Sequence, residues 1–246
     1  MDTHLQNYKL NGFDQVQGWC STDTFKIINF LNSLPINKKG GIAEIGVYHG
    51  KFYILLNAIV DVDFNSYAID IFDKQHLNPD FKHYSVDSVT GNLETFKNNL
   101  QQYDVHKGKN TIIIAGDSTD PALQLTKNIE PGSLKFVSVD GGHSVEHVLN
   151  DLKIAEELVS NEGVVIVDDI LNETSLGVYE GVVRYLETKP TLVPIIMGHN
   201  KLYMSKISYR DYYFDSCQNT KLFKQQFVNN FWGYKIMSYP YFPNEG

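Results

Sequence analysis

Three aspartates stand at the ends of two apolar stretches of the sequence. LKFVSVD (134–140) ends at Asp140, and GVVIVDD (163–169) ends at Asp168 and Asp169. If these stretches are neighbouring strands, the carboxylates meet at one sheet edge, where their repulsion would raise their pKa values unless a cation lies among them. Oxygen ligands favour Mg²⁺ or a similar hard cation. Alternatively, the paired aspartates cap the next segment, and Asp140 forms a turn with the two glycines that follow it.

A histidine follows the first of these acids in the sequence DGGH. His143 lies three residues beyond Asp140, after two glycines that free the backbone to direct the imidazole toward the sheet edge. A neutral imidazole at such a place is suited to general-base chemistry near neutral pH. The alternative is a structural or merely exposed histidine. His147, one helical turn later, is either a supporting partner or a surface residue.

A glycine-containing turn follows the first apolar stretch, in GIAEIGVYHGK. Gly46 and Gly50 would let a ligand approach the backbone and would expose the N–H groups of the next helix. A dinucleotide fingerprint needs glycines at positions i, i+2 and i+5, and this spacing differs from it. Pyrophosphate binding is therefore disfavoured, and ordinary turn glycines are the alternative.

Acids also end the second and third apolar stretches. Asp70 ends the stretch SYAID about 20 residues after the glycine turn, where a carboxylate can accept hydrogen bonds from ribose hydroxyls. Asp117 and Ser118, in AGDS, follow the third stretch at the same edge and can contact an adenine. The alternative for Ser118 is capping of the segment that starts at Pro121. Together with the glycine turn, these residues indicate a nucleoside ligand.

The elements that position these residues alternate along the chain. Strands are expected at 42–46, 66–72, 111–116, 134–140 and 163–169, and helices at 22–34, 50–60, 91–103, 119–129, 145–160 and 175–188. The strands are apolar on consecutive positions, as in a parallel sheet covered on both faces. This order predicts a doubly wound α/β fold with ligands at the carboxyl ends of the strands. After Pro190 the pattern indicates an antiparallel hairpin at one sheet edge.

Composition narrows the class of protein. The chain has 246 residues and 42% hydrophobic content, which suffices for one full domain with a core. A net charge of −8 makes duplex DNA a poor partner. No stretch approaches a membrane span, and the start lacks a signal-peptide pattern, so we expect a soluble cytoplasmic protein with no membrane partner. Cys20 and Cys217 are too few for a disulfide framework or a zinc knuckle.

These motifs resemble class I S-adenosylmethionine-dependent methyltransferases, in particular the metal-dependent O-methyltransferases of the catechol and macrolide-sugar (macrocin and noviose) type. The resemblance covers roughly residues 17–205. EIGVYHG is similar to that group's variant of the cofactor loop, with a tyrosine in place of the middle glycine. DGGH, a helix and then VDD resemble the three-aspartate metal site of the sugar enzymes. The implied fold is a Rossmann-like, mostly parallel sheet with an antiparallel hairpin at one edge and helices on both faces.

The resemblance implies a role for each motif residue. S-adenosylmethionine would be bound by the cofactor loop and by the acids of the second and third strands, which are Glu44, Gly46, Tyr48, Gly50, Asp70, Asp117 and Ser118. Mg²⁺ or a similar divalent cation would be bound by Asp140, Asp168 and Asp169, and His143 and Asp140 would be the catalytic residues. The expected activity is methyl transfer to a hydroxyl of a small-molecule acceptor, a sugar or a glycosylated natural product.

Two other functions remain open at this point. Proteins described as cephalosporin hydroxylases are also similar to this group, although the chain shows no facial triad of two histidines and a carboxylate. A cofactor-binding partner protein without catalysis is the second alternative, and the intact metal and base positions argue against it. A homo-oligomer is compatible with the sequence.

The resemblance divides the chain into three parts. Residues 1–35 form an N-terminal helical or cap segment, 36–206 the cofactor-binding methyltransferase domain, and 207–246 an aromatic-rich C-terminal extension that aligns to no motif. Such aromatic density is too costly to leave in water, so we expect it to pack on the core, on a second subunit or over the acceptor pocket. Acceptor specificity is predicted to lie in residues 1–20, 72–90 and 207–246, with 72–90 as a lid.

Overall fold

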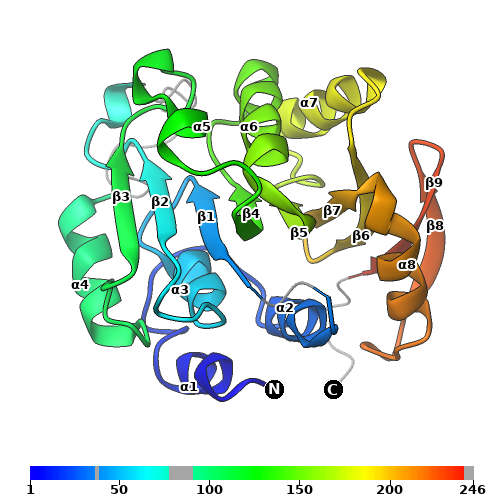
Figure 1. Cartoon of the computed structure of the whole chain (residues 1–246), viewed down its shortest axis with the longest axis horizontal. Helices are drawn as coiled ribbons and strands as arrows, with labels where there is room; N and C mark the ends of the chain where they lie inside the picture. The colour runs from blue at the N-terminus through cyan, green and yellow to red at the C-terminus, as the bar shows by residue number, and fades with distance from the viewer. Residues whose placement is uncertain (37–38, 78–90, 241–246) are drawn as a thin grey trace.

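The computed structural model describes residues 1–36, 39–77 and 91–240. Within these ranges, nine strands form a single mixed sheet in the order β3-β2-β1-β4-β5-β7-β6-β9-β8. Helices cover both faces of this sheet (Figure 1). The predicted Rossmann-like α/β fold is confirmed.

The first five strands form the parallel part of the sheet. They are β1 (Gly41–Ile45), β2 (Ser66–Asp70), β3 (Thr111–Ala115), β4 (Leu134–Val139) and β5 (Val159–Val167). All residues of β1 and β4 are buried. This burial explains the absence of polar alternation in their sequences, because both faces of a central parallel strand are covered by helices.

Two apolar cores separate the helices from the sheet. One face is covered by α1 (Thr3–Asn11), α2 (Thr24–Ser33), α3 (Lys51–Asn57), α4 (Leu93–Tyr103) and α8 (Arg210–Gln218). The other is covered by α5 (Leu125–Asn128), α6 (Val145–Leu158) and α7 (Leu176–Glu187). Short 3-10 helices span Gln75–Leu77, Pro121–Leu123 and Ile207–Tyr209. No helix among the described residues has the length and apolar character needed to cross a membrane.

Two antiparallel hairpins complete the sheet. The predicted hairpin is β6 (Leu192–Gly198) with β7 (Lys201–Lys206), and β7 pairs antiparallel with β5. The tail contributes β8 (Phe227–Phe231) and β9 (Tyr234–Tyr239) as a second hairpin, in which β9 pairs parallel with β6. The outer edge of the sheet is thus built by the C-terminal segment.

Many of the flanking aromatic residues belong to the core. Tyr213, Phe214 and Tyr239 of the tail, and Tyr8 and Phe13 of the N-terminal segment, are buried in the core on the α2 face of the sheet. Simple packing on the sheet therefore accounts for these residues. The last two tail aromatics and most of the predicted lid, residues 78–90, lie outside the described residues.

Candidate active site

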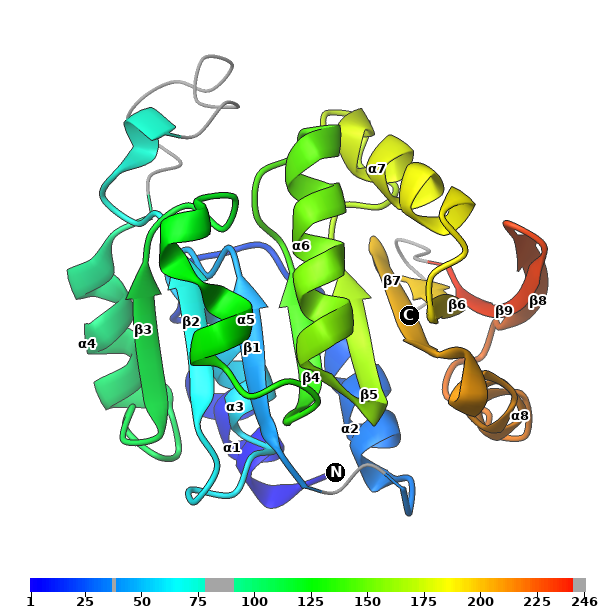
Figure 2. The same cartoon turned by 45° about the horizontal axis from the view of Figure 1, so that its top comes forward.

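A pocket opens at the carboxyl ends of the parallel strands, which point toward the same edge of the sheet (Figure 2). It is lined by Trp19, Ile45, Gly46, Tyr48, Ile69, Asp70, Ile71, Leu77, Gly91, Gly116, Asp117, Ser118, Asp140, Gly141, Gly142, His143, His147 and Asp169. Eight residues that the sequence assigned to binding or catalysis are in this set. The edge of the sheet therefore brings together segments that are far apart in the chain.

The loop after β1 forms the floor of this pocket. Gly46 has a φ of +87°, and a Cβ there would lie 1.8 Å from the carbonyl oxygen of Asp140, so only glycine fits this crossing. Tyr48 also has a positive φ, of +52°. Its backbone N–H donates to Oδ2 of Asp70 over 2.8 Å, which holds the strained turn in place.

Asp70 connects two loops at the end of β2. Besides Tyr48, its carboxylate accepts from the backbone N–H of Phe72, at Oδ1 over 2.5 Å. Burial raises the pKa of Asp70, and the hydrogen bonds from the backbone oppose this shift. Each carboxylate oxygen has a second lone pair, so these bonds leave acceptor capacity for ribose hydroxyls.

Asp117 and Ser118 line the pocket beyond β3. Oδ1 of Asp117 accepts from the backbone N–H of Thr119 over 2.8 Å and lies 3.7 Å from Nε2 of His147. The Ser118 carbonyl accepts from the side-chain amide of Asn150 over 3.0 Å. These contacts tie the loop after β3 to α6 and hold two polar residues at the wall of the pocket.

The acidic end of the pocket combines residues of the two loops that follow β4 and β5. One potential ligand atom from each of Asp140, His143 and Asp169 lies within 4.8 Å of the other two. Nε2 of His143 lies 3.2 Å from Oδ2 of Asp169. Two carboxylates and an imidazole at this separation form a set that can hold a hard divalent cation.

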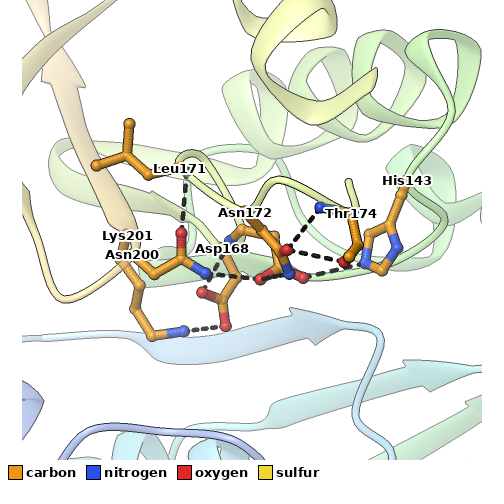
Figure 3. Close-up of polar contacts among 8 residues, drawn as sticks. His143, Asp168, Leu171, Asn172, Thr174, Asn200 and Lys201 are labelled. Carbon is orange, nitrogen blue, oxygen red and sulfur yellow. Dashed lines mark hydrogen bonds and ion pairs between the residues drawn. The ribbon is translucent and has the colours of Figure 1, made fainter. Parts of the chain in front are cut away.

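Asp169 is held in a fixed orientation by Asn172 and Asn200, two residues labelled in Figure 3. Its φ is +58°, and Oδ1 accepts from the amides of Asn172 over 2.9 Å and Asn200 over 2.7 Å. Burial alone would raise the pKa of Asp169, but the hydrogen bonds from His143 and Asn172 and the nearby positive charges outweigh it and lower that pKa. Asp169 is therefore an anion that presents Oδ2 toward His143.

Asp140 and Asp168 have contrasting environments. Burial raises the pKa of Asp140 well above its ordinary range, and the negative charge of Asp168 adds to this effect. Asp168 instead forms an ion pair with the buried Lys201, through Oδ2 and Nζ. The three predicted metal ligands are thus adjacent, but one of them already has a cationic partner.

Two predicted cofactor residues lie behind the pocket surface. Glu44 is 1% exposed, and its desolvation raises its pKa to about 8 against the opposing effects of Lys201 and Ser138. Gly50 has a φ of +92° at the start of α3, where a Cβ would meet the ring of Phe96. Neither residue is among those that line the pocket, and their role in cofactor binding stays a prediction.

Aromatic rings form one wall of the pocket. Tyr48 stacks on His49 with ring centroids 3.9 Å apart, and Trp19 lies against Tyr48 at 5.3 Å. Trp19 is 67% exposed although it lines the pocket. An indole at the wall of the pocket presents a flat apolar face to whatever enters.

Sequence reasoning missed the contribution of the β6–β7 turn. Asn200 and Lys201 were assigned to a hairpin and to no chemistry, yet their side chains contact Asp169 and Asp168. One signal was present in the sequence, because Lys201 precedes the apolar residues LYM in a strand that is otherwise buried. A lysine in such a place needs a buried anion as its partner.

Comparison with known proteins agrees with this geometry. A family model described as a methyltransferase domain matches residues 43–170, which is more than half of the chain. The chain belongs to this methyltransferase family. The match spans β1 to β5 and includes the glycine turn, Asp70 and all three aspartates, and it confirms the class I methyltransferase predicted from the sequence.

Solved structures of methyltransferases share its fold. The O-methyltransferase NovP is 20% identical, with a TM-score of 0.56, and the match covers 75% of this chain and 79% of that chain. The O-methyltransferase TomG from Streptomyces achromogenes, solved with SAM, is 18% identical, with a TM-score of 0.54 and coverage of 84% and 91%. CalS11, a TDP-rhamnose 3'-O-methyltransferase, is 14% identical, with a TM-score of 0.50 and coverage of 74% and 78%. No curated protein sequence matches the chain.

Proposed function

We propose that this methyltransferase uses S-adenosylmethionine and a divalent cation to methylate a hydroxyl of a small-molecule acceptor, namely a sugar or a glycosylated natural product. The observation that carries the proposal is the cluster of Asp140, His143 and Asp169, whose potential ligand atoms lie within 4.8 Å of one another at one end of the pocket. This end is where an acceptor hydroxyl would meet a methyl donor that occupies the rest of the pocket.

The residues present fit S-adenosylmethionine. Asp70 would accept hydrogen bonds from the ribose, Asp117 and Ser118 would contact the adenine, and Gly46 and Tyr48 would lie along the methionine end. The pocket wall includes Gly46, Gly116, Gly141 and Gly142, which let a ligand approach the backbone closely. The solved complex of TomG with SAM supports this assignment, since the two chains share a fold.

The residues present also fit a divalent cation. Desolvation raises the pKa of Asp140 well above its ordinary range, and the negative charges of Asp168 and Asp169 add to this effect. We assign the cation to Asp140 and Asp169, whose hard oxygen atoms suit Mg²⁺. When bound, S-adenosylmethionine supplies an electrophilic methyl group, and the cation lowers the pKa of a coordinated hydroxyl.

His143 then acts on the acceptor. A neutral imidazole whose Nε2–H donates to Asp169 has its basic lone pair on Nδ1, which we assign to take the hydroxyl proton. Asp169 fixes this tautomer and stabilises the imidazolium that forms. The oxygen that loses its proton gains the methyl group, so the chain's own residues provide alignment and proton removal.

The aromatic wall supports a sugar as the acceptor. Trp19 and Tyr48 line the same pocket as the acidic residues, and aromatic ring faces are suited to stacking on sugar rings. CalS11, which shares the fold, is described as a TDP-rhamnose 3'-O-methyltransferase.

A panel assay for S-adenosylhomocysteine release tests the proposal. The panel contains sugar nucleotides, glycosylated natural products and catechols, each incubated with Mg²⁺ and, in parallel, with a chelator. We expect release with a hydroxylated sugar acceptor and Mg²⁺, and mass spectrometry should show one added methyl group on an acceptor oxygen. Release that depends on an amine or thiol acceptor, or that is unchanged by chelation, would contradict the proposed reaction.

A further inference from the structure

The turn between β6 and β7 contacts the segment that carries Asp168 and Asp169, called the acidic pair below. This turn contains His199 and Asn200, both with positive φ values of +54° and +64°. It lies against the residues that follow β5, as Figure 3 shows. The turn is far from the acidic pair in sequence, so its contacts come from the tertiary fold alone.

Asn200 holds the Asp169 segment through both ends of its amide. The amide nitrogen donates to Oδ1 of Asp169 over 2.7 Å, and the amide oxygen accepts from the backbone N–H of Leu171 over 2.9 Å. The Asn200 carbonyl accepts from the N–H of Ile170 over 3.2 Å. These three bonds leave Oδ2 of Asp169 directed toward His143.

Lys201 engages the preceding aspartate. Its ammonium donates to Oδ2 of Asp168, and Oδ1 of the same carboxylate accepts from the backbone N–H of Asp169 over 2.9 Å. The Lys201 side chain is 2% exposed and lies over the ring of Phe52, 4.3 Å from its centroid. Both oxygens of Asp168 thus have partners within the protein, and its charge is balanced by a buried cation.

We infer that Asn200 and Lys201 are positioning residues that give the two aspartates of the acidic pair different roles. Lys201 neutralises Asp168 as an internal counterion. Asn200 orients Asp169, so that Asp169 alone of the pair is available to bind a cation in the pocket. The inference rests on the proposed function for the identity of the cation. It differs from the sequence prediction, which assigned all three aspartates to the metal. Under this arrangement the cation site has two carboxylates, Asp140 and Asp169. It therefore has one negative charge fewer than a site of three aspartates.

The counterion part is tested with a double-mutant cycle. Lys201→Met, Asp168→Asn and the double variant are compared in thermal unfolding and in Mn²⁺ binding followed by electron paramagnetic resonance. Each single variant leaves a buried group without its partner and should lower Tm, whereas the double variant should regain most of the loss. The double variant should also bind Mn²⁺ within about threefold of the wild type, while Asp169→Asn should weaken binding by at least about tenfold.

Three outcomes overturn the inference or separate it from the proposed function. Loss of Mn²⁺ binding in the double variant equal to that of Asp169→Asn would show that Asp168 is a direct ligand. Additive Tm losses in the cycle would show that Lys201 is not its counterion. If the wild type binds no Mn²⁺, the cation proposal fails, and the Tm cycle alone decides the counterion pairing.

The orienting part is tested with Asn200→Gly. Glycine adopts a φ of +64° freely, so this variant keeps the turn and removes only the amide. We expect Mn²⁺ affinity to fall roughly tenfold while S-adenosylmethionine affinity by calorimetry stays at the wild-type value. His199→Gly is the matched control, because it alters the same turn at a residue whose imidazole lies at hydrogen-bonding distance from the Ser21 hydroxyl. An equal effect of both variants on Mn²⁺ would show that turn rigidity, not the Asn200 amide, is responsible.

Discussion

Nε2 of His143 lies 3.2 Å from Oδ2 of Asp169, although the two residues come from different loops of the sheet edge. DGGH directs the histidine from the end of β4 into the pocket, and the end of β5 supplies the acid. This pair gives the pocket an imidazole that a neighbouring carboxylate holds in a fixed orientation. In the proposed reaction, proton removal and cation binding would therefore occur at the same end of the pocket.

Replacement of His143 separates these two roles. His143→Ala should lower kcat by about 10² to 10⁴ because the general base is lost, with little effect on S-adenosylmethionine affinity or Mn²⁺ affinity. His147→Ala is the contrast, since His147 faces Asp117 and should change KM for the cofactor more than kcat. Steady-state kinetics and calorimetry measure both. If His143→Ala keeps wild-type turnover and pH profile, Asp140 or a metal-bound hydroxide must take the proton.

Asp70 is expected to contribute to cofactor affinity in two ways, by a direct contact with the ribose and by holding the neighbouring loops in place. Asp70→Ala removes the acceptor for the ribose hydroxyls and also the partner of the Tyr48 and Phe72 N–H groups. Titration calorimetry should show weaker S-adenosylmethionine binding by about 1 to 3 kcal/mol. Asp63→Ala, an exposed acid before β2, controls for the change in net charge. Unchanged affinity in Asp70→Ala would remove Asp70 from the cofactor site.

Turnover should require a divalent cation. Chelation should abolish methyl transfer, and Mg²⁺ should restore it, because Asp140 and Asp169 need a positive charge between them. Asp169→Asn should raise the Mg²⁺ concentration for half-maximal rate by at least about tenfold. Asp120→Asn, an exposed helix cap, is the control variant. Full activity after exhaustive chelation would reject the cation.

Stability should depend on pH through Glu44. Burial raises the pKa of Glu44 to about 8 in the folded protein, so this residue binds a proton more tightly when folded than when unfolded. Its stabilising contribution is complete below the unfolded pKa of about 4.5 and is lost as the pH rises through about 8. In the wild type, the free energy of unfolding should decrease between pH 5 and pH 8. Denaturant unfolding should show that this decrease is smaller by roughly 1 to 4 kcal/mol in Glu44→Gln.

Glu94→Gln controls for the loss of a carboxylate, because Glu94 is exposed in the first turn of α4. It should keep the wild-type pH dependence of unfolding. A Glu44→Gln variant with that same dependence would show that Glu44 titrates normally in the folded state.

The tail should be required for folding, because it supplies part of the core. Tyr239 is fully buried in β9, and Tyr239→Ala should lower the free energy of unfolding by about 3 kcal/mol or more. Trp232, 44% exposed in the tip of the β8–β9 hairpin, is the matched position, and Trp232→Ala should change stability by less than about 0.5 kcal/mol. Equal effects of the two substitutions would contradict the observed packing of the tail. Deletion from Ser208, which removes α8, β8 and β9, should destabilise the whole domain.

Strong local periodicity explains why the central fold could be predicted from the sequence. β1 to β5 contain consecutive apolar residues and end at, or are followed by, acids or glycines. Short stretches of sequence therefore predict both the strands and the candidate site residues at their carboxyl ends. The tail lacks this signal. β8 has exposed residues at four of its five positions, and β9 joins the sheet only by pairing with β6, which is a long-range contact.

The same distinction separates the predicted site residues from the missed ones. Asp70, Asp140 and Asp169 lie at the ends of strands or within two residues of them, so the strand order alone places them at one edge. Lys201 and Asn200 reach that edge because β7 runs antiparallel beside β5, a pairing that the sequence suggested only as an edge hairpin. The N-terminal Trp19 likewise reaches the pocket through the packing of α1 and α2. Long-range contacts of this kind depend on the order of the strands and have no local sequence pattern that predicts them.

Anomalous diffraction from crystals grown with Mn²⁺ and S-adenosylhomocysteine would locate the cation and the nucleoside in one experiment. We expect a manganese peak at about 2.1 Å from oxygens of Asp140 and Asp169. The adenosyl group should lie along Asp70 and Asp117, with no bond from the metal to Asp168. A nucleoside bound elsewhere, or a pocket that holds S-adenosylhomocysteine with no manganese beside Asp140, would contradict cation-assisted methyl transfer at this site.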